Sequence, residues 1–473
     1  ELLWIASTPN HPVIGQNIYR LENGRFEQVG MSWLKHGFTA LQQNACCPCS
    51  SSGTGTRLGV GCSDPYSSGL NGSQSGLGPR WQVDAFTGAF SYPFAQQGQT
   101  GNSIFKRIQV PADDIRASLH PTARYFGEAQ YITPDDAAAG NGFNNVSWTG
   151  LNRGSVGTNL SIAGATNREQ PAIYAWQVYE PTATISEVNV PGEGQFVVGS
   201  NVIDLGNGIW RYEYAIFNNN SDFSGQSFSI PLGPNVAMID VGHSFPLYHS
   251  GEPYTNASWT TNVTASEITW STEPYLMNQN ANALRWGTTS SFWFTSNGAP
   301  TQASATIGLF KPGNPGDQPV NVDAPGVSSG GGAIVQNYCD PVVNSTGQPG
   351  VITASNVDLT ARTMELEASN LPLNAFGYFI TSLDQAFVPN AGGAAGTLCV
   401  GGSIGRGVAG GIKNSGSMGS FSGTADLDMM PTPTGSTSVM AGQTWNFQAW
   451  HRDTVFIGIT TSNFTDGASV LFF

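Results

Sequence analysis

Hydrophobic and polar residues alternate with a period of two over many short stretches of this chain, each bounded by turn residues. The clearest stretch runs from Trp210 to Ile216, where a large hydrophobic residue occupies every second position. Gly206-Asn207-Gly208 supplies a tight turn before it, so the pattern predicts a hairpin in a half-buried sheet. Asn23-Gly24 predicts a second hairpin, between Ile18–Leu21 and Phe26–Val29.

The same alternation continues toward the C-terminus, in Thr363–Ala368 and again in Trp445–Trp450. Period-two segments separated by turn clusters about every 8 to 12 residues are typical of a β-sandwich. Trp445 and Trp450 are also candidates for an aromatic platform that binds carbohydrate. However, alternation places them on opposite faces of one strand, which favours a role in the hydrophobic core.

Composition supports a fold made of many strands and turns. The chain has 59 Gly and 28 Pro, and 39% of its residues are hydrophobic, which is enough to bury a core. Thr133 and Pro134 predict the start of one short helix, which Gly140 ends. The expected fold class is therefore all-β, with two or more β-sandwich-like domains and long turn-rich loops.

The 473 residues predict at least two domains. The run Gly-Val-Ser-Ser-Gly-Gly-Gly follows a proline-rich segment and predicts a flexible linker over 326–335. This linker separates a large N-terminal β-rich region, 1–325, from a C-terminal β-sandwich module, 336–473. A second, weaker seam near 137–157, where Ala, Gly and Asn crowd together, predicts two subdomains within the first region.

Charge narrows the classes of function. Only 11% of residues are charged, the formal net charge is -14, and the 18 Lys and Arg residues are not clustered, so nucleic-acid binding is excluded. The chain has no apolar run of about 18 residues, so it is not expected to span a membrane. Because the few ionisable residues are scattered and form no recognisable catalytic constellation, an enzyme is less favoured than a non-enzymatic protein.

An even number of cysteines in a turn-rich acidic chain favours disulfides and an oxidising compartment, hence a secreted or cell-surface protein. Four cysteines form one group, and Cys339 with Cys399 is the bridge most strongly indicated. The group of four is also expected to form disulfides, with zinc as the alternative, although its spacing differs from that of paired zinc ligands. The four are Cys46, Cys47, Cys49 and Cys62.

The best metal candidate is one loop that carries two imidazoles and a carboxylate, His243, His249 and Glu252. This combination suits zinc, copper or iron, and hydrogen-bonded loop histidines are the alternative. No cofactor is otherwise indicated. Structural calcium stays open, since oxygen ligands from separate loops, such as those near Asn218–Asp222, leave no fixed spacing.

Both ends of the chain are apolar and prone to form strands. A free terminal strand can complete a neighbouring molecule's sheet, and head-to-tail repetition of that contact gives fibres. The alternative is that both ends pair within their own domains. The candidate assembly strands comprise Leu2, Leu3, Trp4 and Ile5, together with Val470, Leu471, Phe472 and Phe473.

Several segments resemble a large group of uncharacterised secreted proteins from planctomycetes and similar environmental bacteria. The resemblance spans nearly the whole chain, and it implies export from a bacterium and a terminal β module. The resemblance implies no activity for this chain. It does imply an N-terminal portion that is missing from this chain, with which one of the six cysteines would pair. The segments are His11–Asn17, Gly24–Gly30, Ser32–Phe38, Leu58–Tyr66, Tyr212–Tyr214, Asn280–Gly287, Leu398–Gly402, Trp445–Asp453 and Ser462–Gly467.

The leading hypothesis is thus an extracellular structural protein, a surface, matrix or filament subunit whose partners are copies of itself. A carbohydrate-binding or adhesive module, with extracellular polysaccharide as partner, is the alternative. A metal-assisted hydrolase that uses the His243 loop ranks third.

Overall fold

The computed structural model describes residues 1–473 except 46, 66, 67, 155–158, 207, 235, 327–332, 360, 441, 455–459 and 473. About 50% of the chain is strand and 7% is helix, which confirms the all-β prediction. In the described part of the chain, no helix is long and apolar enough to cross a membrane. The helices are α1 (Ser68–Asn71), α2 (Pro134–Ala138) and α3 (Tyr174–Tyr179), with 3-10 turns at Gln74–Gly76, Arg80–Gln82, Ala112–Ile115, Ala391–Gly393 and Gly416–Met418.

The first large sheet, here called the N-terminal sheet, has seven strands in the order β6-β4-β2-β7-β8-β9, with β3 paired to β2. The predicted turn at Asn23-Gly24 joins β2 to β3, and both turn residues have positive φ, as a two-residue hairpin requires. The strands are β2 (Val13–Glu22), β3 (Arg25–Met31), β4 (Leu34–His36), β6 (Leu77–Gly78), β7 (Arg124–Ile132), β8 (Val146–Arg153) and β9 (Leu160–Asn167). A two-stranded sheet pairs β1 (Leu2–Leu3) with β5 (Arg57–Leu58).

Two five-stranded sheets follow, here called the central and outer sheets. The central sheet, in the order β10-β11-β12-β17-β14, contains β10 (Thr184–Val190), β11 (Gly194–Gly206), β12 (Ile209–Asn218), β14 (Met238–Ser244) and β17 (Thr288–Ser296). The outer sheet, in the order β15-β16-β13-β18-β19, contains β13 (Gly225–Pro231), β15 (Thr260–Val263), β16 (Glu267–Ser271), β18 (Pro300–Leu309) and β19 (Gln318–Pro325).

The middle strands of the central sheet, β11, β12 and β17, contain continuous runs of buried residues, so both of their faces are covered. Val198 and Tyr214 belong to a core that the outer sheet completes, whereas Val197 and Phe217 belong to a second core with the N-terminal sheet and α3. The hairpin predicted at Trp210–Ile216 is present as β11 and β12, which pair across the turn. The prediction that it is half-buried is wrong, because a third layer covers the face that alternation assigned to solvent.

Charged residues close one edge of the interface between the central and N-terminal sheets. The carboxylate of Glu213 accepts hydrogen bonds from Arg25 Nε at 2.8 Å and Nη2 at 3.0 Å, and Arg211 Nε lies 3.0 Å from it. Arg211 Nη2 also donates to the backbone oxygen of Asn23 in the β2–β3 turn. These contacts, here called the ionic clasp, join the hairpin of one sheet to a strand of the other.

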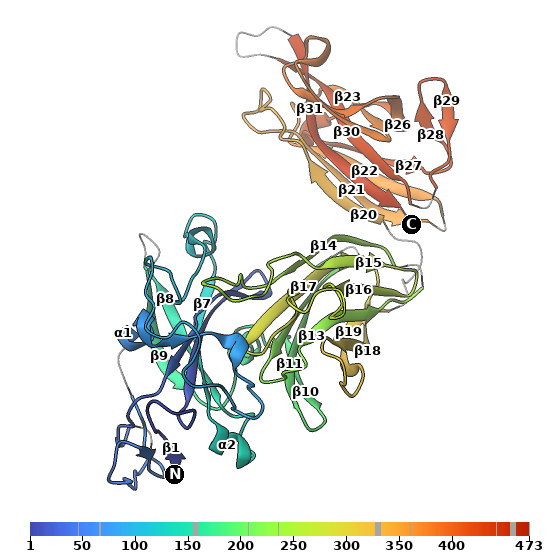
Figure 1. Cartoon of the computed structure of the whole chain (residues 1–473). Helices are drawn as coiled ribbons and strands as arrows, with labels where there is room; N and C mark the ends of the chain where they lie inside the picture. Colours follow the sequence, from blue (N-terminus) through green and yellow to red (C-terminus); the bar gives the residue numbers. More distant parts are fainter. Residues whose placement is uncertain are drawn as a thin grey trace.

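The C-terminal module is a separate sandwich in the described residues from 333 onward (Figure 1). One sheet runs β20-β31-β30-β23-β26 and the other β21-β22-β27. The first contains β20 (Ala333–Tyr338), β23 (Phe376–Ser382), β26 (Gly405–Asn414), β30 (Thr444–Thr454) and β31 (Thr460–Phe472). The second contains β21 (Val351–Asp358), β22 (Thr363–Ser369) and β27 (Phe421–Asp426), and two small hairpins are β24 (Asp384–Pro389) with β25 (Thr397–Gly401) and β28 (Met430–Thr432) with β29 (Gly435–Thr437).

The predicted alternation in β30 matches the structure. Trp445 lies in the core between the two sheets, and Trp450 packs on the opposite face with Tyr378, Val400 and Phe464. That second face is also covered, so neither tryptophan forms part of an open platform for carbohydrate.

The domain boundaries differ in two places from the prediction. Residues 137–153 do not separate two subdomains, because they lie in the connection from β7 to β8 and in β8 itself, and these strands pair directly in one sheet. Positions 155–157 of the predicted seam lie outside the described residues. The predicted linker ends earlier than residue 335, since β20 begins at Ala333. Positions 327–332 of that linker lie outside the described residues.

A buried histidine pair holds the N-terminal segment to the first sheet. His11 Nε2 lies 2.9 Å from His36 Nδ1, and the side chains are 1% and 7% exposed. Because His11 Nδ1 donates to the Ile5 carbonyl, its Nε2 accepts the proton of His36 Nδ1. His36 stacks on Phe94 at 3.8 Å, and its Nε2 is buried without a hydrogen-bond partner in the described part of the chain. Neither ring can take a second proton without losing a bond or burying a charge.

We expect acid to destabilise this region. Burial, with the nearby charges of His11 and Lys35, lowers the pKa of His36 to about 3, whereas an unfolded histidine titrates at about 6.5. Below a pH of about 6.5 the unfolded chain therefore binds more protons than the folded chain. As the pH decreases, the free energy of unfolding decreases by up to about 1.4 kcal/mol per pH unit for this group.

Chemical denaturation between pH 7 and 5 measures this slope. The variant His36→Gln, which does not titrate, should have a smaller slope than the parent protein. Equal slopes would show that the histidine pair does not contribute.

Candidate functional site

The three residues predicted as metal ligands have other partners in the structure. His243 Nε2 accepts from the Trp259 backbone N–H at 3.0 Å. His249 Nε2 lies 3.1 Å from the Met31 carbonyl oxygen, to which it donates, so that Nδ1 accepts from Ser250 Oγ at 2.6 Å. His249 thus uses both ring nitrogens within the protein and His243 uses Nε2, and burial lowers the pKa of each histidine.

Glu252 does not complete a ligand set either. One carboxylate oxygen accepts from the Arg80 backbone N–H at 2.8 Å, and burial raises the pKa of this carboxyl to about 7. No group of three or more His, Cys, Asp and Glu side chains in the described residues is arranged to hold a metal ion. The structure therefore provides no geometry on which to base a metal-assisted reaction of His243, His249 and Glu252.

The oxygen-rich segment considered for calcium is used in folding contacts. Asn218, Asn219 and Asn220 are buried and donate from their side-chain amides to protein oxygens. Asp222 forms an ion pair with Lys311 at 2.7 Å. These amide and carboxylate groups stabilise the connection that follows β12.

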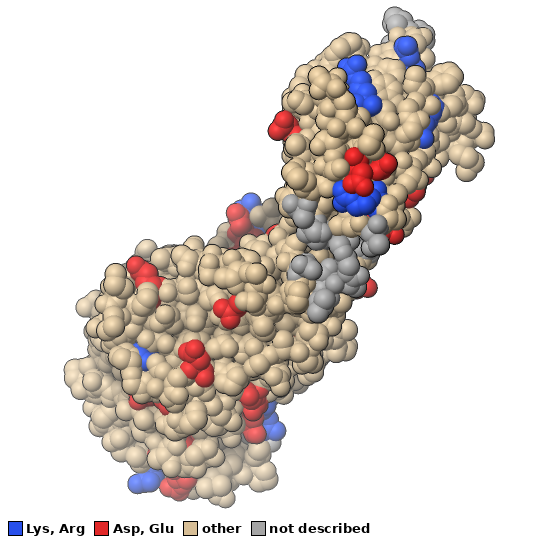
Figure 2. All heavy atoms as spheres, turned by 90° about the vertical axis from the view of Figure 1, so that its right-hand side faces the viewer, with Lys and Arg blue, Asp and Glu red and all other residues tan. Residues whose placement is uncertain are grey.

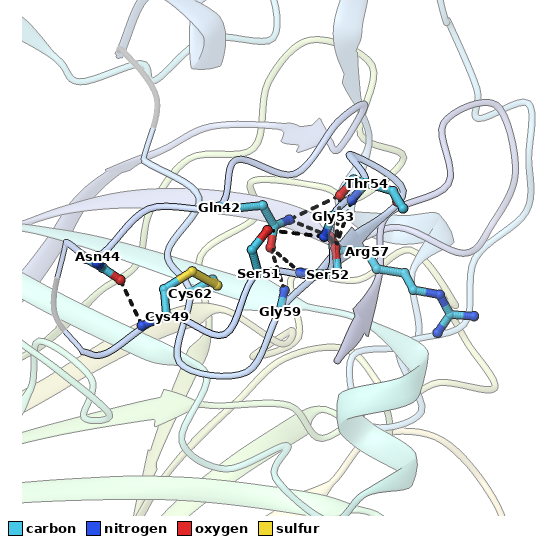
Figure 3. The surroundings of a disulfide bond; sticks show 10 residues. All are labelled: Gln42, Asn44, Cys49, Ser51, Ser52, Gly53, Thr54, Arg57, Gly59 and Cys62. Atoms are coloured by element: carbon cyan, nitrogen blue, oxygen red, sulfur yellow. Dashed lines mark hydrogen bonds between the residues drawn. A yellow bond between two sulfur atoms is a disulfide. The ribbon is translucent and has the colours of Figure 1, made fainter.

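The cysteines form two disulfides. Cys339–Cys399 is present as predicted, and it ties the end of β20 to β25. In the group of four, Cys49 bonds to Cys62 (Figure 3). Cys47 is a free cysteine, so the expectation of a disulfide is wrong for this residue, and Cys46 lies outside the described residues. Two disulfides are typical of a protein from an oxidising compartment.

The Cys49–Cys62 loop owes its shape to amide and hydroxyl side chains. The Gln42 side chain accepts from the backbone N–H groups of Ser52 and Gly59 and donates to the Arg57 carbonyl (Figure 3). Asn44 accepts from the Cys49 N–H at 2.8 Å. This loop is therefore a disulfide-stapled structural element and presents no converging acid, base or nucleophile.

The terminal segments pair within the chain. Leu2 and Leu3 form β1 beside β5, and the Trp4 side chain is buried. At the other end, Val470, Leu471 and Phe472 belong to β31, which has β20 on one side and β30 on the other, while Phe473 lies outside the described residues. The prediction that β31 is free to complete a neighbour's sheet is wrong, since both of its edges are already occupied.

A different strand, β9, forms a long, uncharged edge of a large sheet, which neither terminal segment does. β9 (Leu160–Asn167) forms the edge of the N-terminal sheet and pairs only with β8. It is the longest edge strand without a charged residue in the described part of the chain. By contrast, the edge strands β10, β14, β19 and β26 carry charges at Glu187, Asp240, Asp323, Arg406 and Lys413. Charges on an edge discourage pairing with other chains, so β9 is the least protected edge of its length.

The regular part of β9 is short and apolar. Register with β8 is continuous from Leu160 to Ala163 and shifts between Ala163 and Asn167, a stretch that contains Gly164 with a φ of +91. Within this part the Ile162 side chain is 76% exposed. A solvent-exposed β-branched residue on an unpaired edge is a ready template for another strand.

Beside β9, the outer face of the same sheet is hollowed by a groove of about 580 Å³. Small residues, Gly127 and Ala129, form its floor, and Ile18, Leu151 and Ile162 are among the apolar residues that line it. The surface elsewhere carries few charges, as one face of the molecule shows in Figure 2, where acidic and basic side chains are isolated or paired. β9 carries no charged residue, and Glu128 is the one charged residue among those that line the groove. We take β9 and this groove as the candidate functional site.

Sequence reasoning did not single out β9. The sequence indicates this strand only by the absence of charged residues over Leu160–Asn167. This run follows the segment 137–157, whose many Ala, Gly and Asn residues predicted a boundary between subdomains. Whether a strand lies at the edge of a sheet depends on partners distant in sequence, which the local pattern does not contain.

No family model matches the chain, and no curated protein matches it. The resemblance to secreted proteins of planctomycetes therefore stays a prediction, and the site is interpreted from its own geometry.

The two disulfides should differ in their contribution to stability. Cys339–Cys399 closes a loop with a sequence separation of 60, and Cys49–Cys62 one of 13. If loop-closure entropy in the unfolded chain dominates, replacing both cysteines of a pair with Ala lowers the free energy of unfolding by about 4 kcal/mol for the first and about 3 kcal/mol for the second.

Calorimetry of the two double variants tests this expectation. The first should lower the unfolding transition of the C-terminal sandwich and the second that of the N-terminal unit. A larger loss for Cys49–Cys62 would contradict the loop-closure argument.

Proposed function

We propose that this protein is an extracellular structural protein that associates with copies of itself, and that β9 is the strand that pairs between copies. The observation that carries the proposal is an uncharged, exposed edge strand in a chain whose other long edges are charged. The disulfides support an oxidising, extracellular location.

Backbone groups would supply the affinity of this contact. When two copies of β9 pair, the N–H and C=O groups on their outer edges bond to each other instead of to water, and the two sheets become continuous. A pair of identical strands related by a two-fold axis gives a closed dimer, whereas filaments need a second, different contact. The proposal therefore predicts a dimer as the basic unit.

The groove beside β9 favours a protein partner. Ile162 lies both on the edge and on the wall of the groove, so pairing at the edge would bring apolar side chains of the partner over an apolar surface. Burial of this surface adds to the backbone bonds at roughly 25 cal/mol per Å² of apolar area.

A charge on the edge should disrupt association. We expect Ile162→Lys to weaken self-association at least about tenfold, because pairing would desolvate the ammonium group and place two of them close together. Sedimentation velocity over a range of protein concentrations measures the change.

Two matched variants separate charge from other effects. Ile162→Thr keeps a β-branched residue without charge and should retain most of the association. Leu276→Lys adds the same charge at a side chain that is 90% exposed and outside β9, and it should leave association unchanged. A parent protein that is monomeric at every concentration, or equal association of Ile162→Lys and Leu276→Lys, would refute the proposal.

A further inference from the structure

A second recess lies beside the ionic clasp, and it shares no lining residue with the groove next to β9. Its volume is about 260 Å³, and it is bounded by the β2–β3 hairpin, by β12 and by the loop that contains His120. At about 30 Å³ for a water molecule in the liquid, this is space for several waters or one small ring. Six of its lining residues are charged, namely Arg20, Arg25, Arg211, Glu22, Glu27 and Glu213.

The three guanidinium groups are held in place before any ligand binds. Arg25 lies 3.4 Å from the ring centre of Trp293 and is bidentate to Glu213. Arg20 bonds to Glu27 at 2.6 Å and to Asp114 at 3.0 Å. Fixed side chains lose little entropy when a ligand binds, so the recess is preorganised.

His120 is neutral in this arrangement. Arg20 Nη1, which can only donate, lies 2.8 Å from His120 Nε2, so Nε2 accepts. The proton of the ring is therefore on Nδ1, which donates to Glu22 at 2.5 Å. The walls of the recess thus carry three positive and three negative charges.

Hydrogen-bonding capacity remains on both kinds of group. Arg25 donates hydrogen bonds from Nε and Nη2, and Arg211 donates one from Nη2, so in the described part of the chain the Nη1 group of each has no hydrogen-bond partner. Arg211 Nε lies 3.0 Å from Glu213 as an ion-pair contact and makes no hydrogen bond. A carboxylate oxygen can accept two hydrogen bonds. Glu22 Oε1 already accepts two from Thr122, whereas Glu22 Oε2 and both oxygens of Glu27 accept one each and keep one position free. The recess therefore presents strong donors and strong acceptors close together.

We infer that this recess binds one unit of a neutral sugar. An anion would be repelled by three carboxylates and a cation by three guanidinium groups. For either kind of charged ligand, this repulsion offsets the attraction to the groups of opposite charge. A hydroxyl group accepts from a guanidinium and donates to a carboxylate at the same time, and a sugar ring carries several such groups. This activity goes beyond self-association and provides the chemistry for attachment to an extracellular polysaccharide.

Calorimetric titration of the full chain with neutral monosaccharides (glucose, galactose, mannose and xylose) tests the inference. We expect millimolar binding of at least one of them and weaker binding of glucuronate and glucosamine, which match glucose in shape but carry a charge. Arg211→Gln removes one donor group, and Glu22→Gln replaces an acceptor oxygen with a donor. Each should weaken binding by about tenfold or more, the effect of one lost hydrogen bond to a charged group.

Two controls keep the result interpretable. Arg57→Gln removes an exposed guanidinium outside the recess and should not change affinity. Melting temperatures verify folding. Glu22→Gln, whose one remaining oxygen can still accept from either His120 or Thr122, serves if Arg211→Gln loosens the clasp. The inference is overturned if no neutral sugar binds, if a charged analogue binds equally well, or if Glu22→Gln has the affinity of the parent protein.

Discussion

Burial of the middle strands of the central sheet on both faces is the constraint on which the N-terminal unit depends. β11 and β12 contribute alternate residues to two different hydrophobic cores, so the three layers cannot separate without exposing one of them. Val197 and Val198, adjacent in β11, illustrate this, since they face opposite layers. The unit from β2 to β19 is therefore best described as one three-layer domain.

This constraint explains where the few charged residues are placed. Glu213 lies on the central sheet and is 1% exposed, so its charge must be compensated inside the protein. Arg25 and Arg211 supply that compensation from the hairpin and from the same strand. Lys106, which is also fully buried, donates to three backbone carbonyls in the loops that precede it. Scattered in sequence, these charges act as cross-links between layers and loops in the fold.

Sheet edges and recesses remain for function once the cores are formed. Both terminal strands pair within the chain's own sheets, and several of the other long edges carry charges, which is why the proposed pairing between copies is assigned to β9. The ionic clasp has a second consequence, because the fixed charges that join two sheets also line a polar recess. The proposed self-association and the inferred sugar binding thus use different surfaces of the same three-layer domain.

The sequence by itself determined the class of fold and much of its local structure. Period-two alternation, turn residues and cysteine pairing identified the β11–β12 and β2–β3 hairpins, the strands around Met364 and Trp445, and the Cys339–Cys399 bridge, since each rests on local geometry or on cysteine count. Only the tertiary structure decided that β11 and β12 are covered on both faces, that β31 has no free edge, and that His243, His249 and Glu252 do not form a metal-binding group. It also brought together Arg25 and Glu213, which are far apart in sequence. Those outcomes depend on which strands become neighbours, and neighbours are selected by the packing of distant segments, which no local pattern of residues encodes.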